Sequence, residues 1–368
     1  MRLYVEPTNE CNLACRTCLR NAWDETGGQM TTATFERVLD GLRELAPSPR
    51  PGPDVFFGGY GEPLGHPEIA EMVADAKALG GQVELITNGT LLTESLSRKL
   101  IRAGLDRLWV SLDGAHAESY ADVRLGAELP QVLANVQRFK RLRPPAHRPH
   151  PRIGISFVAM KSNIDDLPDL LELASDLGAA DILVTNLLPH TPDMVDQILY
   201  RRALKDIAYL ESPWLPAVSL PRMEVGERGA NALLTALNSQ RRVSLGDVSL
   251  AAASDRCPFI DRAAAAVGWD GRFSPCLPLL YDQRSYLHGR PRHARRYEVG
   301  NVNERPLAEL WNDPEHLAFR GHVSDFRFSP CAACGGCDNS TGNLQDCTGN
   351  TFPTCGGCLW AQGIIRCP

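Results

Sequence analysis

Short apolar segments alternate with segments of helical periodicity over the first 190 residues, and this alternation limits the folds that the chain can adopt. The apolar segments are rich in Val, Ile, Leu and Phe and show little polar alternation, which is typical of parallel strands buried on both faces. Strands are expected at residues 3–5, 54–57, 83–86, 107–112, 153–158 and 181–187, each of the first five followed by a helical pattern. Six such units predict an α/β fold, either an open doubly wound sheet or an incomplete barrel related to the eightfold one.

The composition changes after this region. Residues 191–250 carry helical stretches broken by proline, and we interpret them as a helical bridge. Over residues 251–368 the regular periodicity is weak, and Gly, Pro, Asn and Cys dominate. This composition favours a small domain organised around metal rather than around a large core. The predicted order is therefore a barrel-like domain over residues 1–190, the bridge, and a metal-bearing tail.

The distribution of cysteine indicates metal binding. Three of the 12 cysteines precede residue 19, and the other nine follow residue 256. A net charge of −6 argues against nucleic-acid binding, and no apolar run is long enough for a membrane span. No signal peptide is recognised either, so a cytoplasmic protein without a membrane partner is expected. Disulfides are uncommon in the cytoplasm, which favours metal ligation for both groups of cysteines.

The first group has the spacing C-x3-C-x2-C, with Cys11, Cys15 and Cys18 in the loop after the first expected strand. A structural zinc site would need a fourth protein ligand, for which His66 is the nearest candidate. Three thiolates can instead hold a [4Fe–4S] cluster and leave one iron open to a small molecule. Ligands gather at the carboxyl ends of parallel strands, and the three cysteines lie at such an end.

Glycine and polar residues follow the next three expected strands, in the segments FFGGYGEP, ITNGT and VSLDG. The residues of interest are Gly58, Gly59, Gly61, Glu62, Thr87, Asn88, Ser111 and Asp113. Glycines let a backbone approach a ligand closely, and a carboxylate such as Glu62 can accept hydrogen bonds from a cationic amine. Each residue alone is typical of a turn or a helix cap. Their recurrence at consecutive strand ends predicts a ligand site.

In this order the motifs resemble those of the radical S-adenosylmethionine (SAM) superfamily. The resemblance implies a partial (β/α)6 barrel, similar to part of a TIM barrel, whose open iron binds the amino and carboxyl groups of SAM. It places Gly59 and Glu62 at the methionine amine, Asn88 or Ser111 near the ribose, Arg124 at the carboxylate and Asn163 at a further contact. Reductive cleavage of SAM then gives methionine and a 5′-deoxyadenosyl radical that removes a hydrogen atom from a second molecule. An aromatic residue often precedes the third cysteine in this superfamily, whereas this chain has Thr17.

The tail holds nine cysteines: Cys257, Cys276, Cys331, Cys334, Cys337, Cys347, Cys355, Cys358 and Cys367. The motif G-x4-C that ends at Cys276 resembles a motif of the SPASM domain. This resemblance implies that the tail holds one or two auxiliary [4Fe–4S] clusters. The spacing of the later cysteines departs from that of the usual SPASM domain, so the assignment of cysteines to clusters stays open. Zinc ribbons are the alternative to iron–sulfur clusters. Cys355 and Cys358 could ligate metal or cycle as a dithiol.

A segment at residues 284–297 holds five arginines and no acid. Such a run is typical of a solvated loop, and its position among the tail cysteines also allows a site for an anionic substrate.

The opening LYVEPTNECNLACRTC and the closing CGGCLWAQGIIRCP are similar to a narrower group, the radical maturases of tungsten-containing aldehyde ferredoxin oxidoreductases. This similarity implies modification of the tungsten–pterin cofactor or of the polypeptide. The implied partners are a protein or peptide substrate and a low-potential electron donor such as ferredoxin or flavodoxin. A radical maturase that forms thioether or carbon–carbon crosslinks in a peptide is one alternative. A non-catalytic zinc-binding interaction protein is the alternative from another class.

Overall fold

The structure is a computed structural model that describes residues 1–46, 51–145, 150–200, 218–221, 243–245, 248–249, 256–334 and 337–368. Its centre is a sheet of nine strands in the order β14-β11-β10-β1-β2-β3-β4-β5-β6. The parallel strands of the first part are β1 (Arg2–Val5), β2 (Asp54–Phe57), β3 (Val83–Thr87), β4 (Arg107–Ser111), β5 (Arg152–Ala159) and β6 (Ala179–Asn186). All six predicted strands are present, and the predicted partial barrel is confirmed.

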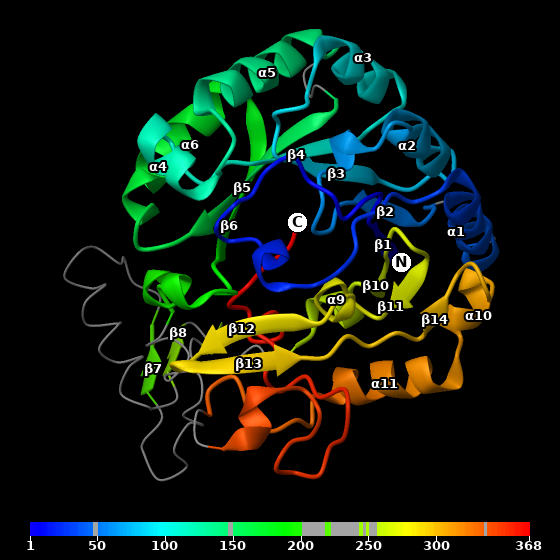
Figure 1. The fold of residues 1–368 in the computed structure, drawn as a ribbon, viewed down its shortest axis with the longest axis vertical. Helices are drawn as coiled ribbons and strands as arrows, with labels where there is room; N and C mark the ends of the chain where they lie inside the picture. The colour runs from blue at the N-terminus through cyan, green and yellow to red at the C-terminus, as the bar shows by residue number, and fades with distance from the viewer. Residues whose placement is uncertain are drawn as a thin grey trace.

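Helices cover the outer face of the curved sheet (Figure 1). They are α1 (Thr32–Leu45), α2 (Ile69–Lys77), α3 (Glu94–Arg102), α4 (Ala117–Val123), α5 (Leu129–Leu142) and α6 (Leu167–Asp176). Thr31 and Thr93 cap α1 and α3, since each side chain accepts a hydrogen bond from a backbone N–H of the first turn. None of the helices that the structure describes combines the length and the apolar composition that a bilayer crossing requires.

The two faces of the sheet bury different sets of side chains. Leu3 and Val5 of β1 belong to the main apolar core under the helices. Tyr4, which points to the opposite face, packs with Phe56 and Trp109 of the neighbouring strands in a separate cluster. Both faces are apolar, which explains why the strands lack polar alternation in the sequence.

The tail adds three strands to the sheet of the barrel, and no sequence pattern predicted this addition. Strand β10 (Ala264–Val267) pairs in parallel with β1, on the side of β1 opposite to β2. Strands β11 (Arg272–Ser274) and β14 (Gly300–Asn301) continue the sheet by antiparallel pairing. The barrel and the cysteine-rich tail therefore share one hydrogen-bonded sheet.

The rest of the tail consists of short elements around a two-stranded hairpin (Figure 1). These are α9 (Pro258–Asp261), β12 (Gln283–Leu287), β13 (Arg290–Ala294), α10 (Leu307–Trp311) and α11 (Pro314–Asp325). Most of the predicted bridge lies outside the described residues. Its described parts are a 3-10 turn, η4 (Pro192–Gln197), and the small sheet of β7 (Val218–Leu220), β8 (Val243–Leu245) and β9 (Val248–Ser249). The predicted domain boundaries stay predictions.

Residues 364–368 lie inside the barrel, where the label C stands in Figure 1. Pro368 accepts a hydrogen bond of 3.1 Å from the hydroxyl of Tyr4 on β1. The carbonyl of Ile364 accepts one of 2.8 Å from the side chain of Asn186 on β6. Because these contacts reach strands far apart in the sheet, the last residues of the chain help to fill the barrel.

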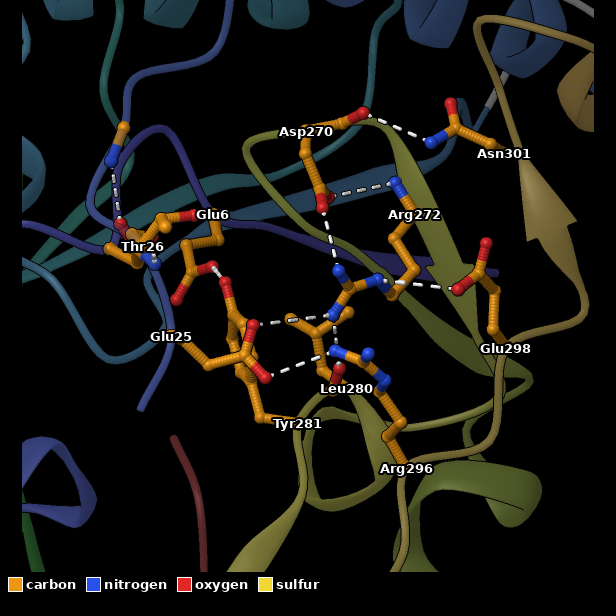
Figure 2. Close-up of polar contacts among 12 residues, drawn as sticks. Glu6, Glu25, Thr26, Asp270, Arg272, Leu280, Tyr281, Arg296, Glu298 and Asn301 are labelled. Carbon is orange, nitrogen blue, oxygen red and sulfur yellow. Dashed lines mark hydrogen bonds and ion pairs between the residues drawn. The ribbon is translucent and has the colours of Figure 1, made fainter. Parts of the chain in front are cut away.

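An ion-pair network joins the loop after β1 to the tail (Figure 2). Arg272 of β11 is at its centre, 2.9 Å from Asp270, 3.4 Å from Glu298 and 4.0 Å from Glu25. Glu25 also pairs with Arg296 at 3.0 Å. Several charges with restricted exposure act together here, a setting in which ion pairs contribute more than an isolated surface pair does.

Beside this network lies Glu6, a fully buried carboxylate directly after β1. It accepts a hydrogen bond of 2.7 Å from the backbone N–H of Tyr60 and a second one from the hydroxyl of Tyr281. Burial raises the pKa of Glu6 from 4.5 to about 7, against the lowering effect of these two hydrogen bonds, and the nearby Asp270 adds to the rise. Arg272 acts in the opposite direction.

This burial predicts a pH dependence of stability. Between pH 4.5 and about 7 the folded protein keeps a proton on Glu6 that the unfolded chain has released, so stability falls as pH rises through this window. We expect Glu6→Gln to remove up to about 3 kcal/mol of this decline. Urea denaturation midpoints of both proteins from pH 5 to pH 8 measure it.

The matched control is Glu10→Gln, which changes an exposed carboxylate four positions further along the same loop. It should leave the decline as in the parent protein. Parallel pH profiles for the parent and for Glu6→Gln would show that Glu6 does not titrate in this window.

Candidate active site

The loop after β1 carries the three cysteines of the first group. The thiol of Cys15 is buried, and those of Cys11 and Cys18 are partly buried. The backbone N–H of Cys18 donates to the carbonyl of Cys15 at 3.1 Å, and that of Arg16 donates to Val123 at the end of α4 at 3.0 Å. The first hydrogen bond closes a turn between Cys15 and Cys18, and the second holds the loop against α4.

The glycines after β2 let the second loop pack directly onto the first. A Cβ atom on Gly59 would lie 2.4 Å from Oε1 of Glu6, and one on Gly61 would lie 2.1 Å from the carbonyl oxygen of Thr8. A Cβ atom on Gly58 would lie 2.6 Å from the side chain of Ile86 on β3. No larger residue fits at these positions without displacing its neighbours. The glycines thus serve contacts within the protein, and their predicted contacts with SAM stay predictions.

Glu62 is buried and connects the second loop to the third. Its Oε1 accepts hydrogen bonds from the hydroxyl of Thr87 at 2.6 Å and from the N–H of Leu64 at 3.1 Å. Its Oε2 accepts one from the N–H of Asn88 at 2.7 Å. Burial raises the pKa of Glu62 despite these donors. A carboxylate has about four acceptor positions, so one remains for a further donor.

Asn88 faces the cysteine loop. Its side-chain nitrogen lies 3.8 Å from Sγ of Cys11 and 3.0 Å from Oδ1 of Asn12. The structure thus brings the ends of β1, β2 and β3 together, as expected for the carboxyl edge of a parallel sheet. Ser111 ends β4 and pairs in register with Ser156 of β5.

Arg124 approaches the same cysteine loop from the end of α4. Its guanidinium lies 3.8 Å from Sγ of Cys15 and forms an ion pair of 2.7 Å with Asp113. Asp113 is fully buried, and its other oxygen accepts a hydrogen bond of 2.9 Å from the N–H of Val158. Burial opposes the charge of Arg124, but the carboxylate of Asp113 outweighs this effect and raises the pKa of the guanidinium.

Asn163 is buried and has all its hydrogen-bonding groups in use. Its nitrogen donates to the carbonyls of Asp113 and Val158, each at 2.9 Å, and its oxygen accepts from the N–H of Met160 at 2.8 Å. In this arrangement Asn163 holds the loops after β4 and β5 together. Its predicted contact with SAM stays a prediction.

The residues of the first loop fit a [4Fe–4S] cluster held by three thiols. The donor set is three soft sulfur ligands in one short loop, the ligand type that iron–sulfur clusters use. The amide of Asn88 and the guanidinium of Arg124 lie 3.8 Å from two of these sulfurs and can donate to them. In the described part of the chain no group of three or more His, Cys, Asp or Glu side chains forms a preformed metal site. The Nε2 of His66 donates a hydrogen bond to the carbonyl of Met30 at 2.9 Å.

The tail cysteines form two neighbouring groups. One cavity is lined by Cys257, Cys276, Cys355 and Cys358. A smaller one is lined by Cys331 and Cys334. The remaining tail cysteines are Cys337, Cys347 and Cys367, and all 12 cysteines of the chain are free thiols. The thiol of Cys347 donates to the hydroxyl of Ser329 at 3.1 Å, and Cys367 accepts from the indole N–H of Trp360 at 3.1 Å.

An aromatic cluster that no sequence pattern predicted adjoins Glu6. The rings of Trp23, Tyr60 and Tyr281 meet edge to face, with centroids 4.8 to 5.6 Å apart. Three separate segments contribute to the cluster, so no local spacing marks it. The signal that was available is the position of Glu6, an acid directly after an apolar strand and at the same edge as the other ligand-type residues.

Comparison with known proteins agrees with this geometry. Residues 5–174 match the family model of the radical SAM superfamily, and residues 257–338 match SPASM, an iron–sulfur cluster-binding domain. The chain is 30% identical to the tungsten-containing aldehyde ferredoxin oxidoreductase cofactor-modifying protein of Pyrococcus furiosus, over 100% of this chain and 96% of that protein. It is 28% identical to the PqqA peptide cyclase of Gluconobacter oxydans, over 96% and 90% of the two chains.

A structure of anSMEcpe with bound AdoMet has the same fold, with a TM-score of 0.57 and 17% identity over 91% of this chain and 86% of that one. The resemblance inferred from the cysteine and glycine motifs is thereby confirmed. The protein is an enzyme of the radical SAM superfamily, and it carries a SPASM iron–sulfur cluster-binding domain after its barrel.

Proposed function

We propose that this radical SAM enzyme matures a tungsten–pterin aldehyde ferredoxin oxidoreductase, by modifying either its cofactor or its polypeptide. The observation that supports this proposal is the similarity to the Pyrococcus furiosus cofactor-modifying protein, which extends over the whole chain. Similarity to PqqA peptide cyclase is slightly lower and covers slightly less of the chain. That second similarity supports the alternative of a peptide crosslinking enzyme.

The thiols of Cys11, Cys15 and Cys18 would hold the SAM-binding [4Fe–4S] cluster. When bound, the cluster and SAM supply a carbon-centred radical that removes a hydrogen atom from the substrate. The residues of the chain orient SAM and exclude water from this chemistry. A low-potential protein such as ferredoxin or flavodoxin would deliver the electron.

We assign recognition of the methionine part of SAM to two charged side chains. The free acceptor position on Glu62 suits a cationic amine, because its other positions are already occupied by protein donors. The guanidinium of Arg124, held by Asp113 beside Cys15, suits the carboxylate. Asn88 and Ser111 would lie nearer the ribose.

The first prediction of the proposed function concerns the cysteine loop. Changing Cys11, Cys15 and Cys18 together to alanine should abolish dithionite-driven release of 5′-deoxyadenosine from SAM. Iron bound by the tail should remain, because its thiols come from other loops. Product release is measured by chromatography and iron by a colorimetric assay on the same samples. Survival of 5′-deoxyadenosine release would place the radical site elsewhere.

The second prediction tests Arg124. Arg124→Gln should weaken SAM binding by about tenfold to a hundredfold, because it removes a charged hydrogen-bond donor. Arg124→Lys should lose less, because the charge is kept. Titration calorimetry without reductant, on anaerobically reconstituted protein, measures the affinity.

A matched control is Arg16→Gln, in the cysteine loop that Arg124 approaches. Arg16 forms an ion pair with the exposed Asp122 at 2.8 Å, and we expect no change in SAM affinity. Equal affinities of Arg124→Gln and the parent protein would remove Arg124 from the SAM site.

The third prediction tests the target. With SAM and reductant, the enzyme should release 5′-deoxyadenosine and change the mass of the cofactor or polypeptide of an immature tungsten oxidoreductase. The triple alanine variant is the control for non-enzymatic change. Mass spectrometry of the separated cofactor and of the digested polypeptide distinguishes the two outcomes. Modification of a short precursor peptide instead, with the oxidoreductase untouched, would support the alternative.

A further inference from the structure

Arg292 differs from Arg290 and Arg296 of the segment 284–297, which have carboxylate partners, and from Arg284 and Arg295, which are exposed. Arg290, on the same strand, forms an ion pair of 2.9 Å with Asp338, and Arg296 pairs with Glu25. In the part of the chain that the structure describes, no carboxylate forms an ion pair with Arg292. Its Nη1 donates to the carbonyl of Gly357 at 3.0 Å.

The side chain of Arg292 lines both cysteine cavities of the tail. The larger cavity, with Cys257, Cys276, Cys355 and Cys358, includes Arg292 in its wall. The smaller cavity, with Cys331 and Cys334, includes it as well. The guanidinium therefore lies between two groups of thiols that come from different loops.

The turn that carries Cys355 and Cys358 is shaped around this guanidinium. A Cβ atom on Gly357 would lie 1.9 Å from Nη2 of Arg292, so a larger residue at this position would displace the guanidinium. A Cβ atom on Gly356 would lie 1.8 Å from the carbonyl of Ser329, and the N–H of Ala332 donates to the carbonyl of Gly356 at 2.9 Å. The two thiol groups are thus tied together through the turn that Arg292 contacts.

Arg292 shares its two cavities with thiols, which become negatively charged when they ligate a metal. Burial lowers the pKa of its guanidinium, and the groups that act against this effect are Cys331, Cys358 and the phenol of Tyr200. A guanidinium nevertheless stays charged in proteins, and a charge removed from water needs a partner. Thiolates that ligate iron would supply this negative charge.

We propose that Arg292 is the counter-charge shared by two auxiliary iron–sulfur sites, one held by Cys257, Cys276, Cys355 and Cys358 and the other including Cys331 and Cys334. The inference rests on the proposed function, in which the tail holds auxiliary clusters. A nearby positive charge favours the reduced, more negative form of a cluster, and net charge and hydrogen bonds to sulfur set cluster potentials. Arg292 raises the reduction potentials of both sites.

The test uses the full chain with Cys11, Cys15 and Cys18 changed to alanine, so that only tail clusters contribute to the signal. In this parent, Arg292→Met and Arg292→Lys are compared by iron content and by potentiometric titration followed by electron paramagnetic resonance. Arg284→Met is the matched control, because Arg284 is exposed on the paired strand β12. We expect Arg292→Met to shift both potentials to more negative values, Arg292→Lys to shift them less, and Arg284→Met to leave them unchanged.

Retained iron with unmoved potentials in Arg292→Met overturns the role of Arg292 and leaves the proposed function intact. A change in the reduction potential of only one tail site overturns the proposal that the two sites share the charge of Arg292. If the parent variant binds no iron, the proposal that the tail holds auxiliary clusters is wrong. If Arg292→Met does not hold iron, Arg292→Lys decides: retention of both clusters supports the shared charge, and loss equal to that of the methionine variant overturns it.

Discussion

Loops that are buried at the edge of a sheet have backbone N–H and C=O groups that no neighbouring strand pairs. The geometry of the candidate active site depends on the buried side chains that form hydrogen bonds with these groups. Glu62 accepts from the loop after β3, Asp113 accepts from the end of β5, and Asn163 bonds to the loops after β4 and β5. These buried side chains fix the loops relative to one another. The cysteine loop is therefore held against a rigid polar framework, as a site that must position a reactive group requires.

An arginine lies beside cysteine thiols at both ends of the chain. Arg124 lies beside Cys15 in the first loop, and Arg292 lies between the thiol groups of the tail. Thiolate-ligated clusters carry negative charge, and removing that charge from water is costly unless a cation is close. A guanidinium suits this task because it keeps its charge when it is buried and offers several donors in one plane. Iron ligated by the tail thiols would thus supply a partner for Arg292, whereas Arg124 already has the carboxylate of Asp113 as its partner.

The parts of the structure that the sequence predicts are those with a local signal. The strands and helices follow from periodicity, and the C-x3-C-x2-C loop follows from its spacing after an apolar strand. The pairing of β10 with β1 could not be predicted, because the segment 264–267 is almost all alanine and its partner lies about 260 positions away. The position of Arg292 depends on a hairpin and on thiols in two later loops. Glu6 was missed because one acid after a strand is ordinary until its burial is known.

The pairing of β10 with β1 has a consequence for dividing the protein into parts. With β2 on one side and β10 on the other, β1 is an interior strand of the sheet. In a fragment that ends before residue 256, the side of β1 that faces β10 would have unpaired N–H and C=O groups. Both faces of β1 also carry apolar residues. Such an edge is a template for association between chains. The barrel alone would therefore tend to associate with other chains as a separate fragment. The tail prevents this association, because β10 covers the edge of β1.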